Sequence, residues 1–255
     1  MSSEKMDAEF DVAADWTRVA VEQLGRDHAV PAACRGSASP SALAWLAEAM
    51  ELTDGETLLD LGGGIGGPAI WAARRYGVRP ILVDPMEGAC RSAARLFGLP
   101  AIRANGQAIP MRAASVDTAW CLGVLCAAAS KSALLGELHR VLVPSGRLGL
   151  LVLVAQTDDL DDVPEGNSFP TQAELVAVLK ETGFVIEDQI DDPGNAPVSW
   201  TRLSDRVDAL IRQQHQHEKA FRQEAEQQER LDHLLSTGQL SSQILLVERD
   251  RREDS

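Results

Sequence analysis

The sequence predicts an α/β fold with a seven-stranded, doubly wound sheet that carries helices on both faces. From residue 57 onward, apolar runs of strand length alternate with segments whose apolar residues recur at helical spacing. One run, residues 146–155, is almost unbroken in its apolar character, which is typical of a central strand buried on both faces at a parallel-type position. The 255 residues are enough to bury a sizeable core around such a sheet.

The N-terminal part is expected to be a helical lid segment, residues 1–40, that precedes the main domain, residues 41–255. Apolar residues among the first thirty or so positions follow a loosely helical spacing. Residues 31–40 combine Pro, Gly and Ser and are therefore predicted to form a loop. Ser41 is expected to be the N-cap of a helix that ends near Met50.

The alternating pattern then gives the elements of the sheet in order. Strands are expected at residues 57–61, 80–84, 100–103, 116–121, 146–155, 184–190 and 242–248. Helices are expected at residues 68–75, 87–97, 130–142 and 171–182. The run Pro144-Ser-Gly146 predicts a chain reversal. Residues 198–236 are dominated by Gln, His, Arg and Glu, so we expect a helical insert of one or two exposed helices before the last strand.

Charge and composition exclude several classes of partner. The chain has 24 Lys and Arg against 38 Asp and Glu, a net charge of −14, which disfavours binding to nucleic acid or to an anionic membrane surface. The longest apolar run, residues 148–155, is too short to span a bilayer, and the polar N-terminus lacks an apolar signal core, so a cytoplasmic protein is expected. The four cysteines lack metal-binding or disulfide-scaffold spacing, so no metal is expected.

The strongest chemical pattern is a glycine-rich turn between a strand and a helix, Leu58-Leu-Asp-Leu-Gly-Gly-Gly-Ile-Gly-Gly-Pro68. Glycine lets a ligand lie against the main chain, and a helix N-terminus attracts a carboxylate or a phosphate. The spacing Gly62-x-Gly64-x-x-Gly67 fits a dinucleotide fingerprint in which Asp84 binds a ribose. Asp60, two residues before the first glycine, would repel a diphosphate but attract an ammonium group, which favours S-adenosylmethionine. A tight turn with no ligand is the third interpretation.

Four motifs in this order resemble the class I S-adenosylmethionine-dependent methyltransferases. They are the glycine turn, Ile81-Leu-Val-Asp84-Pro-Met86, Asn105-Gly106-Gln107-Ala108-Ile-Pro110, and the pair of segments 115–125 and 135–146. The resemblance is to the small-molecule branch (methyltransferase type 11) that includes ubiquinone/menaquinone-type C-methyltransferases. It implies a Rossmann-like sheet and transfer of a methyl group from S-adenosylmethionine to an O, N or C atom of a small molecule, with S-adenosylhomocysteine as product.

The resemblance also implies the residues that bind the cofactor. They are Asp60, Gly62, Gly63, Gly64, Gly67, Asp84, Pro85, Met86, Gly106, Gln107, Ala108, Leu122 and Gly123. In this assignment Asp60 stabilises the methionine ammonium, Asp84 accepts both ribose hydroxyls, and Met86 packs on the adenine. Gln107 stands where the family usually has an adenine-contacting Asp; its carbonyl oxygen is still able to meet the adenine amino group.

No catalytic residue is readable with the same specificity, because methyl transfer needs a base only when the acceptor arrives protonated. His28 is a candidate base, although a lone loop histidine is more often exposed. The acidic residues within 158–165 suggest either a solvated loop or a functional segment that attracts a cationic or amine substrate or holds a metal.

Several further features leave more than one interpretation. The apolar stripe within 200–211 suggests a pocket roof or a second subunit, so a homodimer is possible. Cys126 is expected to be a buried structural thiol and Asp117 a turn cap, while Glu137 and Arg140 are expected to form a solvated face or a local ion pair. Two alternative functions remain, an NAD-dependent oxidoreductase and a non-catalytic cofactor-binding scaffold.

Overall fold

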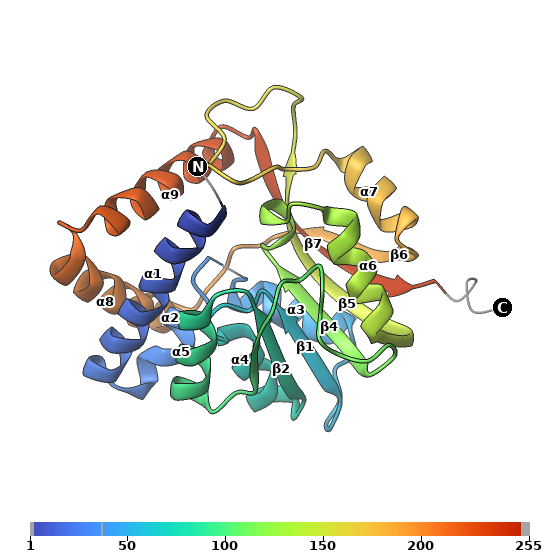
Figure 1. The fold of residues 1–255 in the computed structure, drawn as a ribbon, viewed down its shortest axis with the longest axis horizontal. Coiled ribbons are helices and arrows are strands. Elements are labelled where there is room, and N and C mark those ends of the chain that lie inside the picture. The colour runs from blue at the N-terminus through green and yellow to red at the C-terminus, as the bar shows by residue number, and fades with distance from the viewer. Residues whose placement is uncertain (1–2, 37, 251–255) are drawn as a thin grey trace.

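The computed structural model describes residues 3–36 and 38–250, with side chains from residue 11 onward. It contains a seven-stranded sheet in the order β3-β2-β1-β4-β5-β7-β6, with helices packed on both faces (Figure 1). Strands β1 to β5 pair in parallel, and β7 runs antiparallel to both β5 and β6. The predicted fold class is therefore confirmed. In the part of the chain that is described, no helix is long and apolar enough to cross a bilayer.

The boundaries of the elements are as follows. The strands are β1 Thr57–Leu61, β2 Arg79–Asp84, β3 Ala101–Arg103, β4 Val116–Leu122, β5 Leu142–Ala155, β6 Phe184–Asp191 and β7 Leu240–Arg249. The α-helices are α1 Ser3–Leu24, α2 Ala29–Ala33, α3 Pro40–Ala49, α4 Gly67–Tyr76, α5 Glu87–Phe97, α6 Lys131–Val141, α7 Gln172–Glu181, α8 Val198–His215 and α9 Lys219–Ser236. Two 3-10 turns, η1 Arg26–His28 and η2 Leu125–Ala127, complete the described elements.

Strand β5 has the central position expected from its apolar run, but its two neighbours differ in direction. It is parallel to β4, with Leu148 opposite Ala119, and antiparallel to β7, where the same Leu148 lies opposite Val247. The parallel-type position is therefore right for one side only. An unbroken apolar run reports burial of both faces, which both kinds of pairing produce in the middle of a sheet covered by helices.

The predicted chain reversal at Pro144-Ser-Gly146 is wrong, because these residues lie inside β5. The register of β5 against β4 shifts there: Val116 pairs with Leu142, and the next pair is Thr118 with Arg147. The extra residues of β5 form an irregular bulge, which lets α6 run directly into the strand. Turn-forming residues therefore mark a bulge here, where the sequence indicated a turn.

Two predictions near the N-terminus need correction. Ser39 is the N-cap of α3, and its Oγ accepts the N–H of Ala42 at 3.2 Å, so the expected cap at Ser41 is wrong. Pro40 occupies the first turn, where its missing N–H costs nothing, and this fixes the helix start two residues earlier. The expected loop over residues 31–40 is also partly helix, because α2 continues to Ala33 with Pro31 in its first turn.

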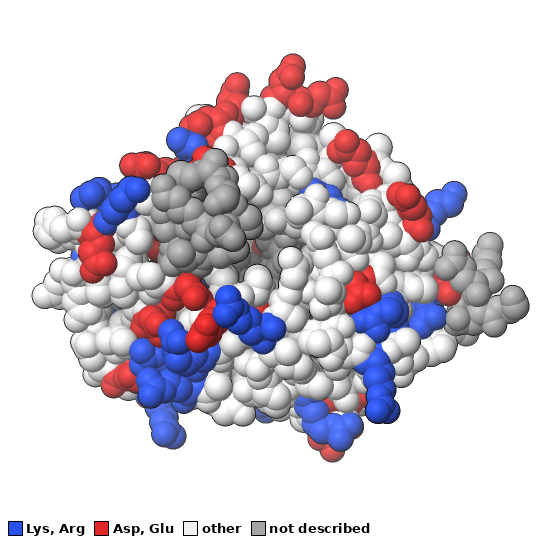
Figure 2. Space-filling view, in the orientation of Figure 1, with Lys and Arg blue, Asp and Glu red and all other residues white. Residues whose placement is uncertain are grey.

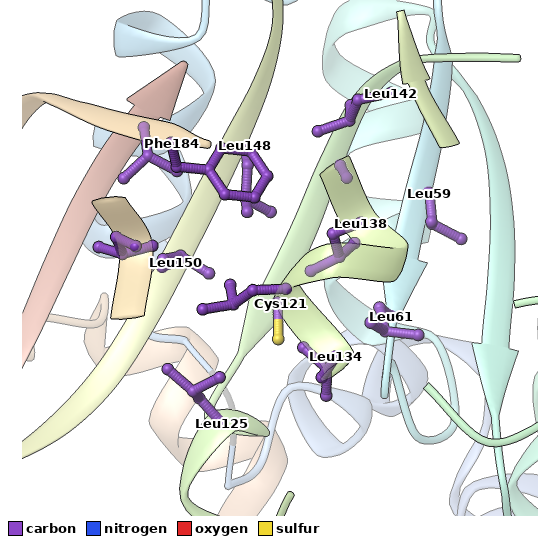
Figure 3. Packing of buried hydrophobic residues seen from close by; sticks show 14 of the residues in the cluster. Leu59, Leu61, Cys121, Leu125, Leu134, Leu138, Leu142, Leu148, Leu150 and Phe184 are labelled. Atoms are coloured by element: carbon purple, nitrogen blue, oxygen red, sulfur yellow. The ribbon is translucent and has the colours of Figure 1, made fainter. Parts of the chain in front are cut away.

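The hydrophobic core lies on both faces of the sheet. On one face, Leu134 and Leu138 of α6 point toward Leu59 and Leu61 of β1 and toward Cys121 of β4 (Figure 3). Each buried leucine contributes about 1.5–3 kcal/mol relative to an exposed one. Helices α3 and α4 cover the opposite face, where Trp120 is fully buried and its indole N–H contacts Met50 Sδ at 3.0 Å.

Helices α1, α2, α8 and α9 form a separate layer at one end of the sheet, which we call the helical cover (Figure 1). Its small core contains Trp16, Val21, Val207 and Ile211, from both ends of the chain. The ring of His215 stacks on Trp16 with their centroids 4.4 Å apart. The expected N-terminal helices and the two-helix insert are both present, and much of the apolar stripe of the insert is buried within this chain.

Candidate cofactor site

The glycine turn connects β1 to α4 at the carboxyl end of the sheet. Gly62, Gly64 and Gly66 have φ angles of 68°, 55° and 84°, in the left-handed region where a side chain would be strained. Gly66 is the N-cap of α4, and Pro68 lies in the first turn of that helix. The predicted strand–turn–helix unit is therefore present, with the N-terminus of α4 directly after the turn.

Asp60 lies beneath this turn with its carboxylate 1% exposed. A Cβ atom at Gly63 would fall 2.6 Å from Asp60 Cγ and Oδ2, so only glycine leaves room for the carboxylate at this point. Oδ2 has no hydrogen-bond partner among the described residues. A buried, unsatisfied carboxylate oxygen is costly in a folded protein, and it indicates that this position serves something other than stability.

The environment of Asp60 disfavours its negative charge. Burial, and secondarily the nearby charge of Asp84, raise the pKa of the Asp60 carboxyl to about 7, against the smaller opposing effect of the Ala69 backbone amide. Asp60 is therefore poised to change charge near neutral pH. A cation placed at the turn would favour its ionised form.

Asp84 ends β2 and is 2% exposed. Its Oδ2 accepts the N–H of Gly64 at 2.9 Å, and its Oδ1 accepts the N–H of Met86 at 2.9 Å. One carboxylate thus joins the glycine turn to the loop after β2. Pro85 is exposed, while Met86 is half-buried and packs against a small apolar group that includes Ile65.

The third loop contains the predicted residues Gly106, Gln107 and Ala108. The N–H of Gln107 donates to Asn105 Oδ1 at 2.9 Å, which closes a tight turn. A Cβ at Gly106 would come within 3.2 Å of Leu134 Cδ1, so the loop lies close against α6. The half-buried carboxamide of Gln107 forms no hydrogen bond with the described residues, which leaves it available to a ligand.

Strand β4 supplies the last two predicted residues. Leu122 ends the strand and is 5% exposed, with its side chain in the core cluster of α3 and α4. Gly123 has a φ of 75°, and its N–H donates to the carbonyl of Leu151 at 2.9 Å. The loop after α2 approaches this point, since the carbonyl oxygen of Gly36 is 3.4 Å from the place of a Gly123 Cβ.

The helical cover rests directly on the glycine turn. A Cβ at Gly67 would lie 2.5 Å from the carbonyl oxygen of Ala33 and 2.6 Å from the backbone nitrogen of Cys34. Arg35 then holds the cover together, because it forms an ion pair with Asp208 of α8 and donates to Thr17 Oγ1 of α1 at 2.8 Å. Figure 2 shows a hollow near the middle of the face that is turned to the viewer in Figure 1.

Three polar residues outside the turn have structural contacts that sequence patterns could not show. Asp117 Oδ2 accepts the N–H of Thr57 at 2.7 Å and ties β4 to β1, so it caps the neighbouring strand and not a turn. Glu137 and Arg140 bond the backbone of the third loop, and their assignment to a solvated face or a local ion pair is therefore incomplete. These contacts join residues 28 or more positions apart, beyond the reach of helical spacing.

His28 is not the exposed loop residue that was expected. It lies in η1, is 6% exposed, and its Nδ1 is 3.2 Å from the carbonyl of Gly25, while Nε2 has no partner among the described residues. The η1 turn that contains His28 packs against α1, α2 and α8 of the helical cover. A role as a base stays a prediction.

The acidic segment and Cys126 have simpler environments. Most of residues 158–165 are exposed, and Asp162 pairs with Arg230 of α9 at 3.3 Å. No group of three or more His, Cys, Asp or Glu suited to a metal ion occurs in the described parts of the chain. Burial raises the pKa of the Cys126 thiol, whose Sγ lies 3.3 Å from the carbonyl of Gly123, as a structural thiol would.

Comparison with known proteins agrees with this geometry. The profile of a family described as "Methyltransferase domain" matches residues 59–150. The methyltransferase phqN of Penicillium fellutanum is 29% identical over 185 residues, which cover 63% of this chain and 56% of that protein. The chain spans about half the length of the curated relatives it matches.

Solved structures share the fold at low sequence identity. The [4+2]-cyclase SpnF superposes with a TM-score of 0.67 at 23% identity, covering 84% of this chain and 85% of the other. The geranyl diphosphate C-methyltransferase of Streptomyces coelicolor A3(2), solved with Mg2+, geranyl diphosphate and S-adenosyl-L-homocysteine, superposes with a TM-score of 0.62 at 14% identity, covering 82% and 77%. The sheet order and the glycine turn agree with the match of residues 59–150 to the methyltransferase-domain family.

Proposed function

We propose that this protein transfers a methyl group from S-adenosylmethionine to a small-molecule acceptor. The observation that carries the proposal is the buried carboxylate of Asp60 beneath the glycine turn, whose Oδ2 has no partner among the described residues. A carboxylate there opposes a diphosphate and suits the α-ammonium of an amino-acid moiety. The residues of the site thus fit the cofactor that the domain class implies.

Each loop at the carboxyl edge of the sheet has one part of the cofactor to hold. The turn around Gly62 and Gly64 would lie against the methionyl part, and Asp84 has a carboxylate suited to a vicinal diol. Met86 offers a soft apolar surface to the adenine, and Gln107 a carbonyl oxygen to its amino group. When bound, S-adenosylmethionine supplies an activated methyl group, so the protein's own contribution is to align the acceptor and to exclude water.

The helical cover is the proposed wall of the acceptor site, with residues 1–40 as its lid segment. It lies where ligands bind in open α/β sheets, over the carboxyl ends of the strands. Curated and structural relatives named for methylation of sterols and of geranyl diphosphate support a small-molecule acceptor. The quoted motifs favour the ubiquinone/menaquinone C-methyltransferase-like branch, while O, N and C acceptors all suit the scaffold.

The cellular setting is a further part of the proposal. A net charge of −14 supports a protein that avoids nucleic acid, and we propose that this protein acts in the cytoplasm. A homodimer stays a prediction: Val207 and Ile211 of the apolar stripe are buried within one chain, which weakens the argument that first suggested it.

Two alternative functions are testable against the same site. The spacing Gly62-x-Gly64-x-x-Gly67 favours a nicotinamide cofactor, in which case NADH would quench the protein fluorescence and S-adenosylhomocysteine would not. Gln107 in place of the usual acid, together with the lack of an evident base, favours the other alternative, a cofactor-binding scaffold without turnover. Labelled S-adenosylmethionine incubated with a metabolite extract would yield a labelled product only if methyl transfer occurs.

Calorimetric titration with S-adenosylhomocysteine tests the cofactor assignment. We expect saturable binding by the wild type and a roughly tenfold or greater loss in Asp84→Ala, because charge-assisted hydrogen bonds are worth about 1.5–3 kcal/mol. The exposed Asp158→Ala is the matched control and should bind as the wild type does. Absence of S-adenosylhomocysteine binding by the wild type would refute the proposal.

A further inference from the structure

The segment that carries Gln107 leaves the sheet between β3 and β4, so its backbone polar groups need partners elsewhere. Ile109 is its buried anchor, with a side chain 3% exposed in the core against α6. Two side chains of α6 satisfy its peptide groups. Glu137 Oε2 accepts the N–H of Ile109 at 2.7 Å, and Arg140 Nη2 donates to its carbonyl at 2.8 Å.

Arg140 makes further bonds that lock this arrangement. Its Nη1 donates to the carbonyl of Met111 at 2.7 Å. Its Nε and Nη2 donate to the two carboxylate oxygens of Glu137 at 2.6 and 2.8 Å, a bidentate pair of fixed geometry. The Arg140 guanidinium lowers the pKa of the Glu137 carboxyl, which keeps both groups charged. An exposed ion pair alone would contribute little, but this one bonds backbone groups as well.

The anchored residues are close in the chain to the predicted adenine contact. Gln107 is two residues before Ile109, and Asn105 closes the turn between them through its carbonyl and its Oδ1, each 2.9 Å from a backbone nitrogen. Few backbone torsions separate the anchor from the Gln107 carboxamide. A shift at Ile109 therefore displaces the carboxamide by a similar amount, and hydrogen bonds weaken steeply with misalignment.

We propose that Glu137 and Arg140 are positioning residues for cofactor binding. They hold residues 105–111 against α6 so that the Gln107 carboxamide meets the adenine edge. The inference rests on the proposed function, since it concerns the same bound cofactor. It assigns a task to two residues of α6 that touch the cofactor only through the loop that they hold.

A double-mutant cycle read by calorimetry with S-adenosylhomocysteine tests this role. Gln107→Ala and Arg140→Ala are each expected to weaken binding about tenfold, and the double variant to bind no more weakly than the weaker single one. In a protein that lacks the Gln107 carboxamide, the position of residues 105–111 no longer affects the contact with the adenine. A purely structural role would instead make the two losses multiply.

Three further variants make the test robust. Arg140→Lys keeps the positive charge but lacks the planar guanidinium that bonds several acceptors at once. Its affinity should therefore lie between those of Arg140→Ala and the wild type. Arg147→Ala removes an ion pair of similar length, to Glu51 at 2.7 Å, and should leave the affinity unchanged. If Arg140→Ala does not fold, Glu137→Gln replaces it in the cycle, with faster hydrogen exchange of the Ile109 amide as its own readout.

The outcomes separate the two proposals. Absence of S-adenosylhomocysteine binding in the wild type would overturn the proposed function. Wild-type binding together with multiplying losses, or with full affinity in Arg140→Ala, would overturn the positioning role alone.

Discussion

Replacing Asp60 by Asn is expected to weaken binding of S-adenosylhomocysteine severely and, above neutral pH, to make the protein more stable. The substitution keeps the size of the side chain and removes a buried charge, one oxygen of which has no partner among the described residues. In the variant, the ammonium group of the cofactor lacks a charged hydrogen-bonding partner. Loss of such a partner weakens binding roughly a hundredfold. The same substitution relieves the native state of a buried anion.

The sign of the stability effect follows from the pKa. The Asp60 carboxyl has a pKa of about 7 in the folded protein and an ordinary value of 3.8. Between these values the folded protein retains a proton that the unfolded chain has lost, so wild-type stability falls as pH rises through this window. The cost is complete above about pH 7 and amounts to on the order of 4 kcal/mol. Asp60→Asn removes this cost and its pH dependence.

Chemical denaturation across this window measures the effect. The stability gain of Asp60→Asn over the wild type should be small near pH 4 and should grow to several kcal/mol by about pH 8. The exposed Asp158→Asn provides the matched control and should show no such trend. If the wild type is as stable as Asp60→Asn at every pH, an interaction in solution must stabilise the ionised Asp60 carboxylate.

The pH dependence of cofactor affinity provides a second reading of the same group. Binding of an ammonium favours the ionised form of Asp60, so the wild-type affinity for S-adenosylhomocysteine should fall as pH drops below about 7, by up to about tenfold per unit. The Asp60→Asn variant should lack this slope. A slope equal in both proteins would assign the titration to another group.

Substituting Gly67 by Ala is expected to displace the N-terminal part of the helical cover. A Cβ there would meet the carbonyl oxygen of Ala33 and the backbone nitrogen of Cys34 at 2.5 and 2.6 Å, and backbone atoms cannot turn aside as a flexible side chain can. Overpacking of this kind costs about 1–3 kcal/mol. We expect lower stability, faster proteolysis within residues 26–36, and weaker binding of S-adenosylhomocysteine.

Gly136→Ala is the matched control for this prediction. Gly136 lies within α6, and a Cβ there would have nothing within 4 Å. Alanine is the better helix former by about 1 kcal/mol, so this variant should be slightly more stable than the wild type. A Gly67→Ala protein with unchanged stability and proteolysis would mean that the cover does not rest on the glycine turn.

The sheet and its glycine turn were predictable because their determinants are local. An apolar run of five residues followed by glycines and Pro68 specifies strand, turn and helix within a dozen positions, and β1 has the predicted boundaries. Five of the other six strands differ from the prediction by one or two residues at one or both ends, and β5 begins four residues earlier than predicted, since strand ends depend on pairing partners. The fold class and the turn therefore followed from periodicity, glycine placement and family resemblance.

Tertiary structure decided the features that depend on residues far apart in the chain. The bond of Glu137 to Ile109, the ion pair of Arg35 with Asp208, and the burial of Val207 against α1 each join distant positions. The spacing of residues within one helix or strand does not predict which distant residues its polar side chains will contact. Likewise, the motif places Asp60 near the glycines, but only the packed sheet, helix and turn remove its water and leave one oxygen unsatisfied, because solvation depends on every neighbour in space.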